Sequence, residues 1–484
     1  MNEFLISLDR KFSTNKNLCF FAVSILCAIF TCFYFVNPPA VSLFEVDSYS
    51  YIGYHAMRTV GYPLFLSLIK TLMGGYETIP YFQSIIFALS LGFLSLNLTV
   101  ITKSLSSGLI FLFTLFCLYY LIRFNFEVLP ESLYLSVLFI LAAFFIKFVK
   151  EQTRSSFIFI SLCLGLLILI RPSGYFILIA TVPLILLSHW DFFKRNILLF
   201  LAPLSLCLIA GASVNYYNHG FFSTQSFLGH NLYGKIAFVL NEGMKSEDPL
   251  EQAMLDKMIH AMKPIQDPIE KADSLQIYCL LMMPAYDKLR YELLRRFEEV
   301  LPETKAIKDK DAFYKSIAIK VIKQNPAKYA EDVALNYAGL WLLVDLKTDA
   351  VQNKLLDYIE QYVQIKEFQE IKLDYSYITK KTIIIKKTIP LFMVYVVKIF
   401  LGFCFLISFY FIFMVARFLI HQQKVPLLLL MGAFYALNIH GSYLLTAALQ
   451  AGIVRYAAVM WPYLILMSII FLNIVINKIY GKQQ

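Results

Sequence analysis

Charged residues are scarce in this sequence, and long apolar runs take up most of it. Only 16% of the 484 residues are charged and 59% are hydrophobic, and the mean hydropathy is +0.64. Soluble domains carry about 25% charged and about 45–50% apolar residues. The composition therefore excludes an ordinary soluble protein and predicts an all-α polytopic membrane protein.

Patterns typical of metal sites and disulfide frameworks are also missing. Seven of the eight cysteines fall in apolar runs, and only Cys279 lies in polar sequence, so no disulfide framework is expected there. The sequence has no C-x-x-C pair and no H-E-x-x-H motif. We therefore expect no cofactor and assign no metal ligand, while a metal requirement stays open.

The net charge of +10 does not indicate nucleic-acid binding. Residues 215–388 contain 24 basic and 24 acidic residues, whereas the rest of the chain contains 19 basic and 9 acidic ones. The excess therefore lies around the apolar runs, where it reports membrane topology. We expect a membrane, and no nucleic acid, as a partner.

Ten apolar runs are candidates for membrane spans, because crossing the hydrocarbon takes about 20 residues. They are Leu18–Val36, Tyr81–Ile101, Gly108–Ile122, Glu131–Phe148, Phe157–Ile170, Gly174–Ser188, Ile197–Val214, Leu391–Val415, Pro426–Ala447 and Tyr456–Val475.

The positive-inside rule orients these runs with both termini in the cytoplasm. In that orientation, 13 of the 19 basic residues outside 215–388 face the cytoplasm, and five of the nine acidic residues face outward. We predict a multi-pass protein of the cytoplasmic (inner) membrane. Its predicted parts are a catalytic module over 1–214 with a first external loop at 37–80, an extracytoplasmic helical domain over 215–388, and C-terminal spans over 389–484.

Shorter helices are predicted outside the membrane. In the first external loop, Asp47–Met57 and Pro63–Met73 have the pattern of amphipathic surface helices. In the outer domain we expect helices over Asp311–Gln324, from Pro326 onward and over 349–370.

The first external loop gathers most of the polar residues that could perform chemistry. The stretch Phe44–Phe65 contains Glu45, Asp47, His55 and Arg58 together with four tyrosines. Further candidates for catalysis or substrate binding lie along the chain: Tyr62, Glu131, Arg171, His230, Lys398 and Arg455.

A carboxylate among cations at an outer membrane surface suits one reaction in particular. If a sugar arrives on a polyprenyl phosphate, its leaving group is a weak base, and no general acid is needed. The enzyme needs a carboxylate as general base and cations that hold the departing phosphate. Asp47 is the candidate base, and the candidate cations are Arg58, Arg171, Lys398 and Arg455. A single attack without a covalent intermediate predicts inversion at the anomeric carbon.

Seven short motifs follow one another along the chain: D-S-Y-S-Y at 47–51, R-T-V-G-Y-P-L-F at 58–65, L-P-E-S at 129–132, R-P-S-G-Y at 171–175, G-H-N-L-Y-G at 229–234, N-P-A-K-Y at 325–329 and R-Y-A-A-V-M-W-P at 455–462. In this order they resemble the GT-C superfamily of polyprenyl-phosphate-sugar-dependent glycosyltransferases, near the protein O-mannosyltransferases and the lipid A aminoarabinose transferase. The resemblance implies a GT-C-like fold with Asp47 as catalytic base and Glu131 as a second acidic site residue.

Each candidate also has a structural interpretation. Asp47 could cap its helix, and Glu131 could simply favour a helix start. Arg171 and Arg455 could anchor helix ends at lipid headgroups, and Lys398 could reach the surface from within a span. The structural and functional interpretations stay open on the sequence alone.

Two other functions compete with glycosyl transfer. A transporter or flippase of lipid-linked glycans would place charges near the middle of the membrane, often within an internal repeat; here the charges gather at one face. A non-catalytic assembly factor would leave Asp47 and the arginines without a role. The sequence does not name the sugar, and lipid, glycan and protein acceptors all remain open.

Overall fold

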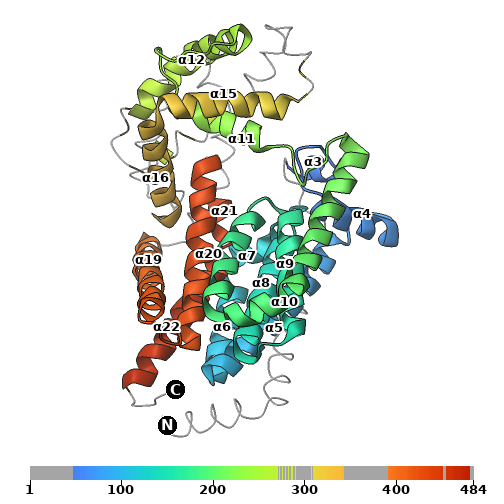
Figure 1. Ribbon diagram of the computed structural model, residues 1–484, viewed down its shortest axis with the longest axis vertical. Helices are drawn as coiled ribbons and strands as arrows, with labels where there is room; N and C mark the ends of the chain where they lie inside the picture. Colours follow the sequence, from blue (N-terminus) through green and yellow to red (C-terminus); the bar gives the residue numbers. More distant parts are fainter. Residues whose placement is uncertain are drawn as a thin grey trace. The chain divides into compact units, whose positions relative to one another are not determined.

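The computed structural model describes residues 47–270, 310–342, 391–450 and 454–479, with isolated positions between 272 and 309. Within these residues the chain is helical and contains no extended strand, as the sequence predicts (Figure 1). The predicted span Leu18–Val36, the candidate Glu45 and the amphipathic stretch 349–370 lie outside the described residues.

The chain divides into two compact units. Unit 1 comprises residues up to Ser226, Leu406–Ser442 and residues from Ala458, and unit 2 comprises Phe227–Phe405 and Tyr443–Ala457. Their boundaries fall after Ser226 and within three helices of the C-terminal part of the chain. The division predicted at 214 and 388 stays a prediction.

The helices of unit 1 are mostly apolar. They are α3 (Ser48–Ile52), α4 (Gly61–Met73), α5 (Ile79–Thr102), α6 (Leu105–Cys117), α7 (Tyr119–Arg123), α8 (Glu131–Glu151), α9 (Arg154–Ile170), α10 (Gly174–His219) and α22 (Trp461–Ile479). Helices α19 (Leu391–Ile420), α20 (Leu427–Leu449) and α21 (Val454–Ala458) each contribute residues to both units.

Six helices among the described residues are long and apolar enough to cross a membrane: α5, α8, α10, α19, α20 and α22. The prediction of a multi-pass helical membrane protein is thereby confirmed at this level. Helix α10 contains non-helical backbone at His189 and Asn196, between two of the predicted spans. The count of ten spans stays a prediction.

Of the two surface helices predicted between residues 47 and 73, one agrees with the structure and the other is shorter than predicted. Helix α4 matches its prediction and ends at Gly74, whose left-handed backbone stops it. The helix predicted over Asp47–Met57 is wrong in length, because α3 ends at Ile52 and Tyr54 adopts a left-handed conformation. Tyr51 is consequently buried while His55 is exposed.

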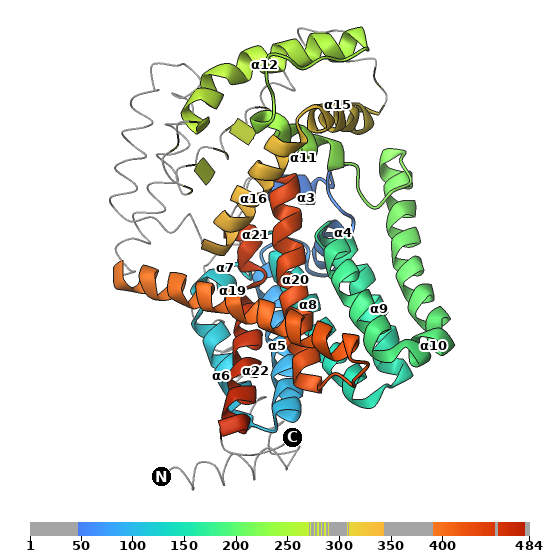
Figure 2. The same ribbon diagram turned by 60° about the vertical axis from the view of Figure 1, so that its left-hand side comes forward.

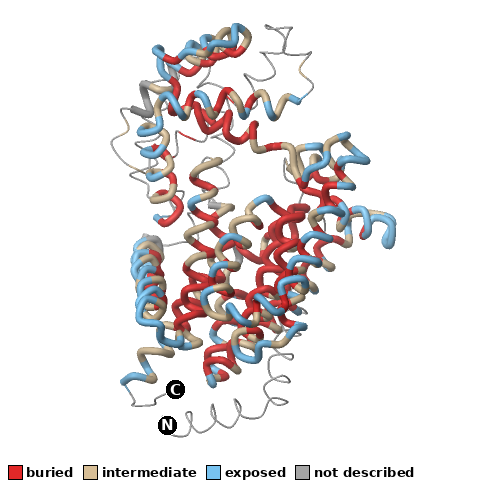
Figure 3. The backbone as a smooth tube through the Cα atoms, viewed as in Figure 1, coloured by how far each residue is buried: buried red, intermediate tan, exposed pale blue. Residues whose placement is uncertain are grey.

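Helix α8 is the centre of unit 1. Buried residues occupy most of its length, and it packs against α5 and α9 (Figure 3). Phe145 stacks on Phe434 of α20 with ring centroids 4.2 Å apart, and Tyr463 of α22 donates to the carbonyl of Leu138 over 3.1 Å. Helices α9 and α10 lie side by side (Figures 1 and 2).

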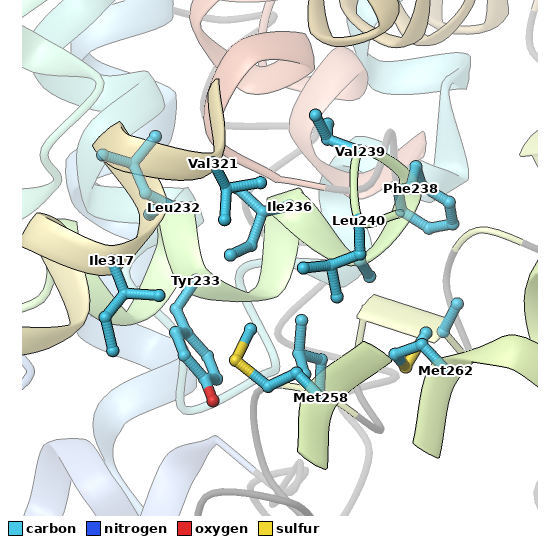
Figure 4. Packing of buried hydrophobic residues seen from close by; sticks show 14 of the residues in the cluster. Leu232, Tyr233, Ile236, Phe238, Val239, Leu240, Met258, Met262, Ile317 and Val321 are labelled. Atoms are coloured by element: carbon cyan, nitrogen blue, oxygen red, sulfur yellow. The ribbon is translucent and has the colours of Figure 1, made fainter. Parts of the chain in front are cut away.

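Unit 2 has a hydrophobic core of its own. It is built by α11 (Leu228–Lys235), the 3₁₀ turn η1 (Ile236–Phe238), α12 (Pro249–Glu270), α15 (Lys310–Gln324) and α16 (Pro326–Leu342). Figure 4 shows Tyr233, Ile236, Met258 and Ile317 among its packed side chains. The helices predicted over Asp311–Gln324 and from Pro326 are confirmed.

Candidate functional site

Asp47 stands immediately before α3 and does not cap it. Its side chain accepts no capping bond from the helix; instead Oδ1 lies 2.6 Å from Nη2 of Arg58. Arg58 also donates from Nε to Ser50 Oγ over 2.8 Å and from Nη1 to the Tyr51 hydroxyl over 3.2 Å. The guanidinium carbon lies 4.4 Å from the centroid of the Tyr51 ring. These contacts hold the Asp47 carboxylate beside a fixed cation.

A second ion pair joins the start of α8 to the end of α9. Glu131, in the first turn of α8, is fully buried, and its Oε1 lies 3.3 Å from Nη1 of Arg171 at the end of α9. Arg171 also lies 5.6 Å from the centroid of the Tyr134 ring. Burying a carboxylate is costly unless a cation accompanies it. A role for Glu131 limited to starting its helix does not explain this pairing.

Tyr51 lies within the electrostatic range of both ion pairs. Burial raises the pKa of Tyr51, and of the neighbouring charges Arg58 and Arg171 lower it while Glu131 and Asp47 raise it. The structure therefore brings together two carboxylates and two arginines, which we call the charge cluster: Asp47, Arg58, Glu131 and Arg171.

Tyr62 is a buried residue that packs beside the charge cluster. Its ring meets that of Tyr51 edge to face, with centroids 5.4 Å apart. Burial raises the pKa of Tyr62 well above its ordinary value, and Glu131 raises it further. Its hydroxyl donates to Gln83 over 3.0 Å and is buried. Tyr62 is thus a buried neighbour of the charge cluster, and its role in substrate binding stays a prediction.

Gln83 of α5 holds the segment between α7 and α8 in place. Its amide nitrogen donates to the carbonyls of Asn125 and Glu127 over 3.0 and 2.9 Å. Glu127 in turn pairs with Arg123. The sequence analysis missed Gln83, although an amide within an apolar helix is costly in hydrocarbon and marks a group that needs partners.

The segment between α3 and α4 is also fixed to the end of α9. The Thr59 hydroxyl donates to the carbonyl of Ile170 over 2.8 Å. A Cβ on Gly61 would lie 2.7 Å from the carbonyl oxygen of Leu169, so only glycine permits this approach. These contacts keep Arg58 and Arg171 on neighbouring segments of the structure.

His230 belongs to unit 2, where it forms a dyad with Asp311. Nδ1 of His230 lies 2.9 Å from Oδ1 of Asp311, which also accepts the backbone N–H of His230 over 3.1 Å. The imidazole stacks on Phe227 and meets the edge of Tyr314. The sequence analysis singled out His230 but missed Asp311, which lies 81 positions away.

The remaining predicted cations also belong to unit 2. Lys398 is half-buried on α19. Arg455 lies on α21, with its guanidinium carbon 5.4 Å from the centroid of the Tyr456 ring. The charge cluster of unit 1 therefore contains four of the eight predicted site residues, with Tyr62 beside it.

Unit 2 also contains a buried ion pair that the sequence analysis missed. Nζ of Lys235 lies 2.6 Å from Oδ2 of Asp332, and both side chains are fully buried. The Tyr278 hydroxyl donates to Oδ1 of Asp332 over 3.0 Å. Burial raises the pKa of Asp332 and lowers that of Lys235, while the attraction between them opposes both shifts.

No protein-family model, curated protein or solved structure matches this chain. Within the part of the chain that the structure describes, no group of three or more His, Cys, Asp or Glu side chains could hold a metal ion.

Proposed function

We propose that this chain is an inverting glycosyltransferase that moves a sugar from a polyprenyl-phosphate donor to an acceptor hydroxyl. The observation that carries the proposal is the charge cluster, in which two carboxylates are each held by an arginine around Tyr51. Each of its four members belongs to one of the motifs that resemble the GT-C superfamily in sequence.

Exposure supports different roles for the two carboxylates. The side chain of Asp47 keeps 30% of its surface exposed, whereas Glu131 is fully buried against Arg171. An acceptor hydroxyl must come within about 3 Å of the base, which Asp47 allows and Glu131 does not. Asp47 is accordingly the proposed general base, and Glu131 is proposed to hold Arg171 in place.

The proposed reaction is a single displacement. Asp47 takes the proton of the acceptor hydroxyl as the acceptor oxygen forms a bond to the anomeric carbon. The bond from that carbon to the phosphate oxygen breaks, and its electron pair leaves with the polyprenyl phosphate. Arg58 and Arg171 supply positive charge near the departing anion, and such preorganised charge is usually the largest single contribution to catalysis.

The finer features of the proposal rest on the sequence. We propose a GT-C-like fold of ten spans in the cytoplasmic (inner) membrane, with Asp47 and residues 215–388 outside the cytoplasm. A lipid, glycan or protein acceptor suits this placement. Lys398, Arg455 and His230 are proposed as further substrate contacts, and the first two as cations for the donor phosphate.

The test compares purified wild-type protein with Asp47→Asn in detergent. The donors are polyprenyl phosphates carrying mannose, glucose or arabinose, and the measurements are donor binding and the release of free or transferred sugar. Loss of a positioned base is expected to lower turnover about 10²–10⁴-fold with donor binding retained. Asp191→Asn, at a carboxylate that is 77% exposed, is the matched control.

Two results would count against the proposal. Wild-type protein that binds none of these donors would favour a different function, of which a transporter or flippase of lipid-linked glycans is the leading alternative. An Asp47→Asn variant that turns over donor as fast as wild type would remove Asp47 from the catalytic role.

A further inference from the structure

Tyr54 occupies a backbone conformation that normally belongs to glycine. Its φ is +44°. Its N–H donates to the carbonyl of Tyr51 over 3.1 Å, and the next N–H, of His55, donates to Ser50 over 2.9 Å. This pair of bonds is the Schellman pattern that ends a helix, and glycine is the usual residue at its left-handed position. A tyrosine there is strained, although Gly53 is its immediate neighbour in the sequence.

The Tyr54 side chain is anchored outside its own loop. Its hydroxyl donates to Oδ1 of Asn215, which lies near the end of α10 and is fully buried. Nδ2 of Asn215 donates to the carbonyl of Ser223 over 2.6 Å. The ring of Tyr54 meets that of His219 edge to face, with centroids 4.7 Å apart. Asn215 thus uses both ends of its amide to join the first external loop to the turn after α10.

The turn at Tyr54 leads directly to the charge cluster. The backbone N–H of Arg58 donates to the carbonyl of His55 over 2.8 Å, and the Arg58 side chain returns to Asp47 at 2.6 Å. The chain reversal at Tyr54 therefore sets the position of the Arg58 backbone. A shift of this turn would move the partner of Asp47.

The segment that receives this anchor continues into unit 2. Ser226, the last residue of unit 1 before the boundary, donates from Oγ to the carbonyl of Ala56 over 3.4 Å. Thr224 shares a 2.7 Å hydrogen bond with Tyr175, four residues after Arg171. Residues 223–226 thus contact the segments that carry both arginines of the charge cluster.

We propose that Tyr54 is a positioning residue, whose bond to Asn215 fixes the Asp47–Arg58 pair for sugar transfer. This inference rests on the function proposed above. It explains why a strained tyrosine stands where glycine would be relaxed: the side chain supplies an anchor that glycine lacks. Tyr54 acts through the loop and makes no contact with the reacting atoms.

Two substitutions distinguish the effect of the side-chain anchor from the effect of the left-handed turn. Tyr54→Gly relaxes the left-handed backbone and removes the anchor, whereas Tyr54→Phe keeps the ring and removes only the hydroxyl. Tyr217→Phe, on α10 and 89% exposed, is the matched control. The full-length protein is purified in detergent, and hydrogen exchange over residues 47–60 is measured beside donor turnover with the three polyprenyl-phosphate sugars.

Both Tyr54 variants are expected to exchange faster over residues 47–60 than wild type, with Tyr217→Phe unchanged. Their kcat is expected to fall roughly 10- to 100-fold, because small displacements of a reacting group have that effect. The donor KM should stay near that of wild type, because the loss concerns the transition state and not donor binding. The relaxed backbone of Tyr54→Gly should not restore its kcat, because the variant still lacks the anchor to Asn215.

The results that overturn the inference are distinct from those that overturn the function. If wild type transfers sugar and Tyr54→Gly is equally active, the tyrosine only completes a turn and the positioning role is wrong. Unchanged hydrogen exchange in Tyr54→Phe would show that the anchor does not order the loop, and this result holds whether or not the protein transfers sugar. Wild type without activity on any donor overturns the function and, with it, a positioning role in transfer.

Discussion

Asp47 and Glu131 differ most in their surroundings. Asp47 is accessible beside Arg58, while Glu131 is enclosed with Arg171 where α8 begins and α9 ends. Two carboxylates, each paired with an arginine, therefore lie in unlike surroundings. Removing one partner of a buried pair leaves the other charge unpaired in a poorly solvated place, which is much worse than removing both.

Glu131→Gln is expected to destabilise the protein by about 3 kcal/mol or more, because it leaves the buried guanidinium of Arg171 without its carboxylate. Reversible unfolding in mixed detergent micelles measures the loss. Asp191→Asn, which breaks the exposed pair with Lys194, should change the unfolding free energy by less than about 0.5 kcal/mol. Equal effects of the two substitutions would contradict the structural role given to Glu131.

The lowered pKa of Asp311 predicts how the stability of unit 2 depends on pH. Burial alone would raise its pKa, but hydrogen bonds from the His230 side chain and from the backbone N–H groups of Gly229 and His230 outweigh it and hold the pKa below the ordinary 3.8. Below about pH 4 the unfolded chain binds this proton before the folded chain does. Stability contributed by Asp311 is therefore present above that pH and lost as the pH falls toward the folded-state pKa.

The pH dependence of unfolding stability is compared between wild type and Asp311→Asn. Asp256→Asn, at an exposed carboxylate, is the control. Urea unfolding in detergent at pH 3 to 6 is followed by the fluorescence of Trp341, after the other two tryptophans are replaced by Phe. The Asn variant should show a shallower loss of stability with acid than wild type. Parallel pH curves would show that the contacts of Asp311 do not contribute in this way.

At the scale of elements, the close approach between α4 and α9 depends on one missing side chain. A Cβ on Gly61 would lie 2.7 Å from the carbonyl oxygen of Leu169 and 2.8 Å from its carbon. Backbone atoms cannot yield as a flexible side chain can. The N-terminus of α4, and with it the loop that carries Arg58, would have to move.

Gly61→Ala is expected to cost about 1–3 kcal/mol of stability, as overpacking does, and to lower donor turnover by displacing the first loop. Unfolding in detergent and sugar release measure the two effects. Gly402→Ala on α19 is the matched control, because nothing lies within 4 Å of the Cβ it would add. A Gly61→Ala variant as stable and as active as the Gly402→Ala protein would show that the approach is not needed.

At the scale of the whole molecule, the proposed topology places unlike segments on opposite sides of the membrane. Asp191 lies between the two non-helical points of α10, a place proposed to face the cytoplasm, and its side chain is 77% exposed. Lys263 lies on α12 in unit 2, proposed to face outward, and is 62% exposed. Both positions are accessible to a reagent that reaches their side.

Single cysteines introduced at these two positions, in a chain whose own cysteines are replaced by alanine, test the topology. A membrane-impermeant maleimide should label Lys263→Cys in intact cells, and Asp191→Cys only after the membrane is permeabilised. The cysteine-free chain is the background control. Labelling of both positions in intact cells would contradict the proposed orientation of α10.

The sequence by itself determined the helices and the membrane class, because both depend on local pattern. Hydropathy marked the six apolar helices, and the start of α16 at Pro326 was readable from one residue. The motifs also contain all four members of the charge cluster. Where a local signal was misread, as in the helix predicted over Asp47–Met57, the cause was a tyrosine at a left-handed position, which sequence rules reserve for glycine.

Tertiary structure alone decided which of these residues meet. Glu131 pairs with Arg171 forty positions away, and Tyr54 bonds Asn215 across 161 positions. The sequence around one partner does not predict the other. A local pattern shows which face of a helix is apolar, but not which other helix ends beside that helix. Those pairings follow from how α8, α9 and α10 pack, and packing depends on all the side chains between them at once.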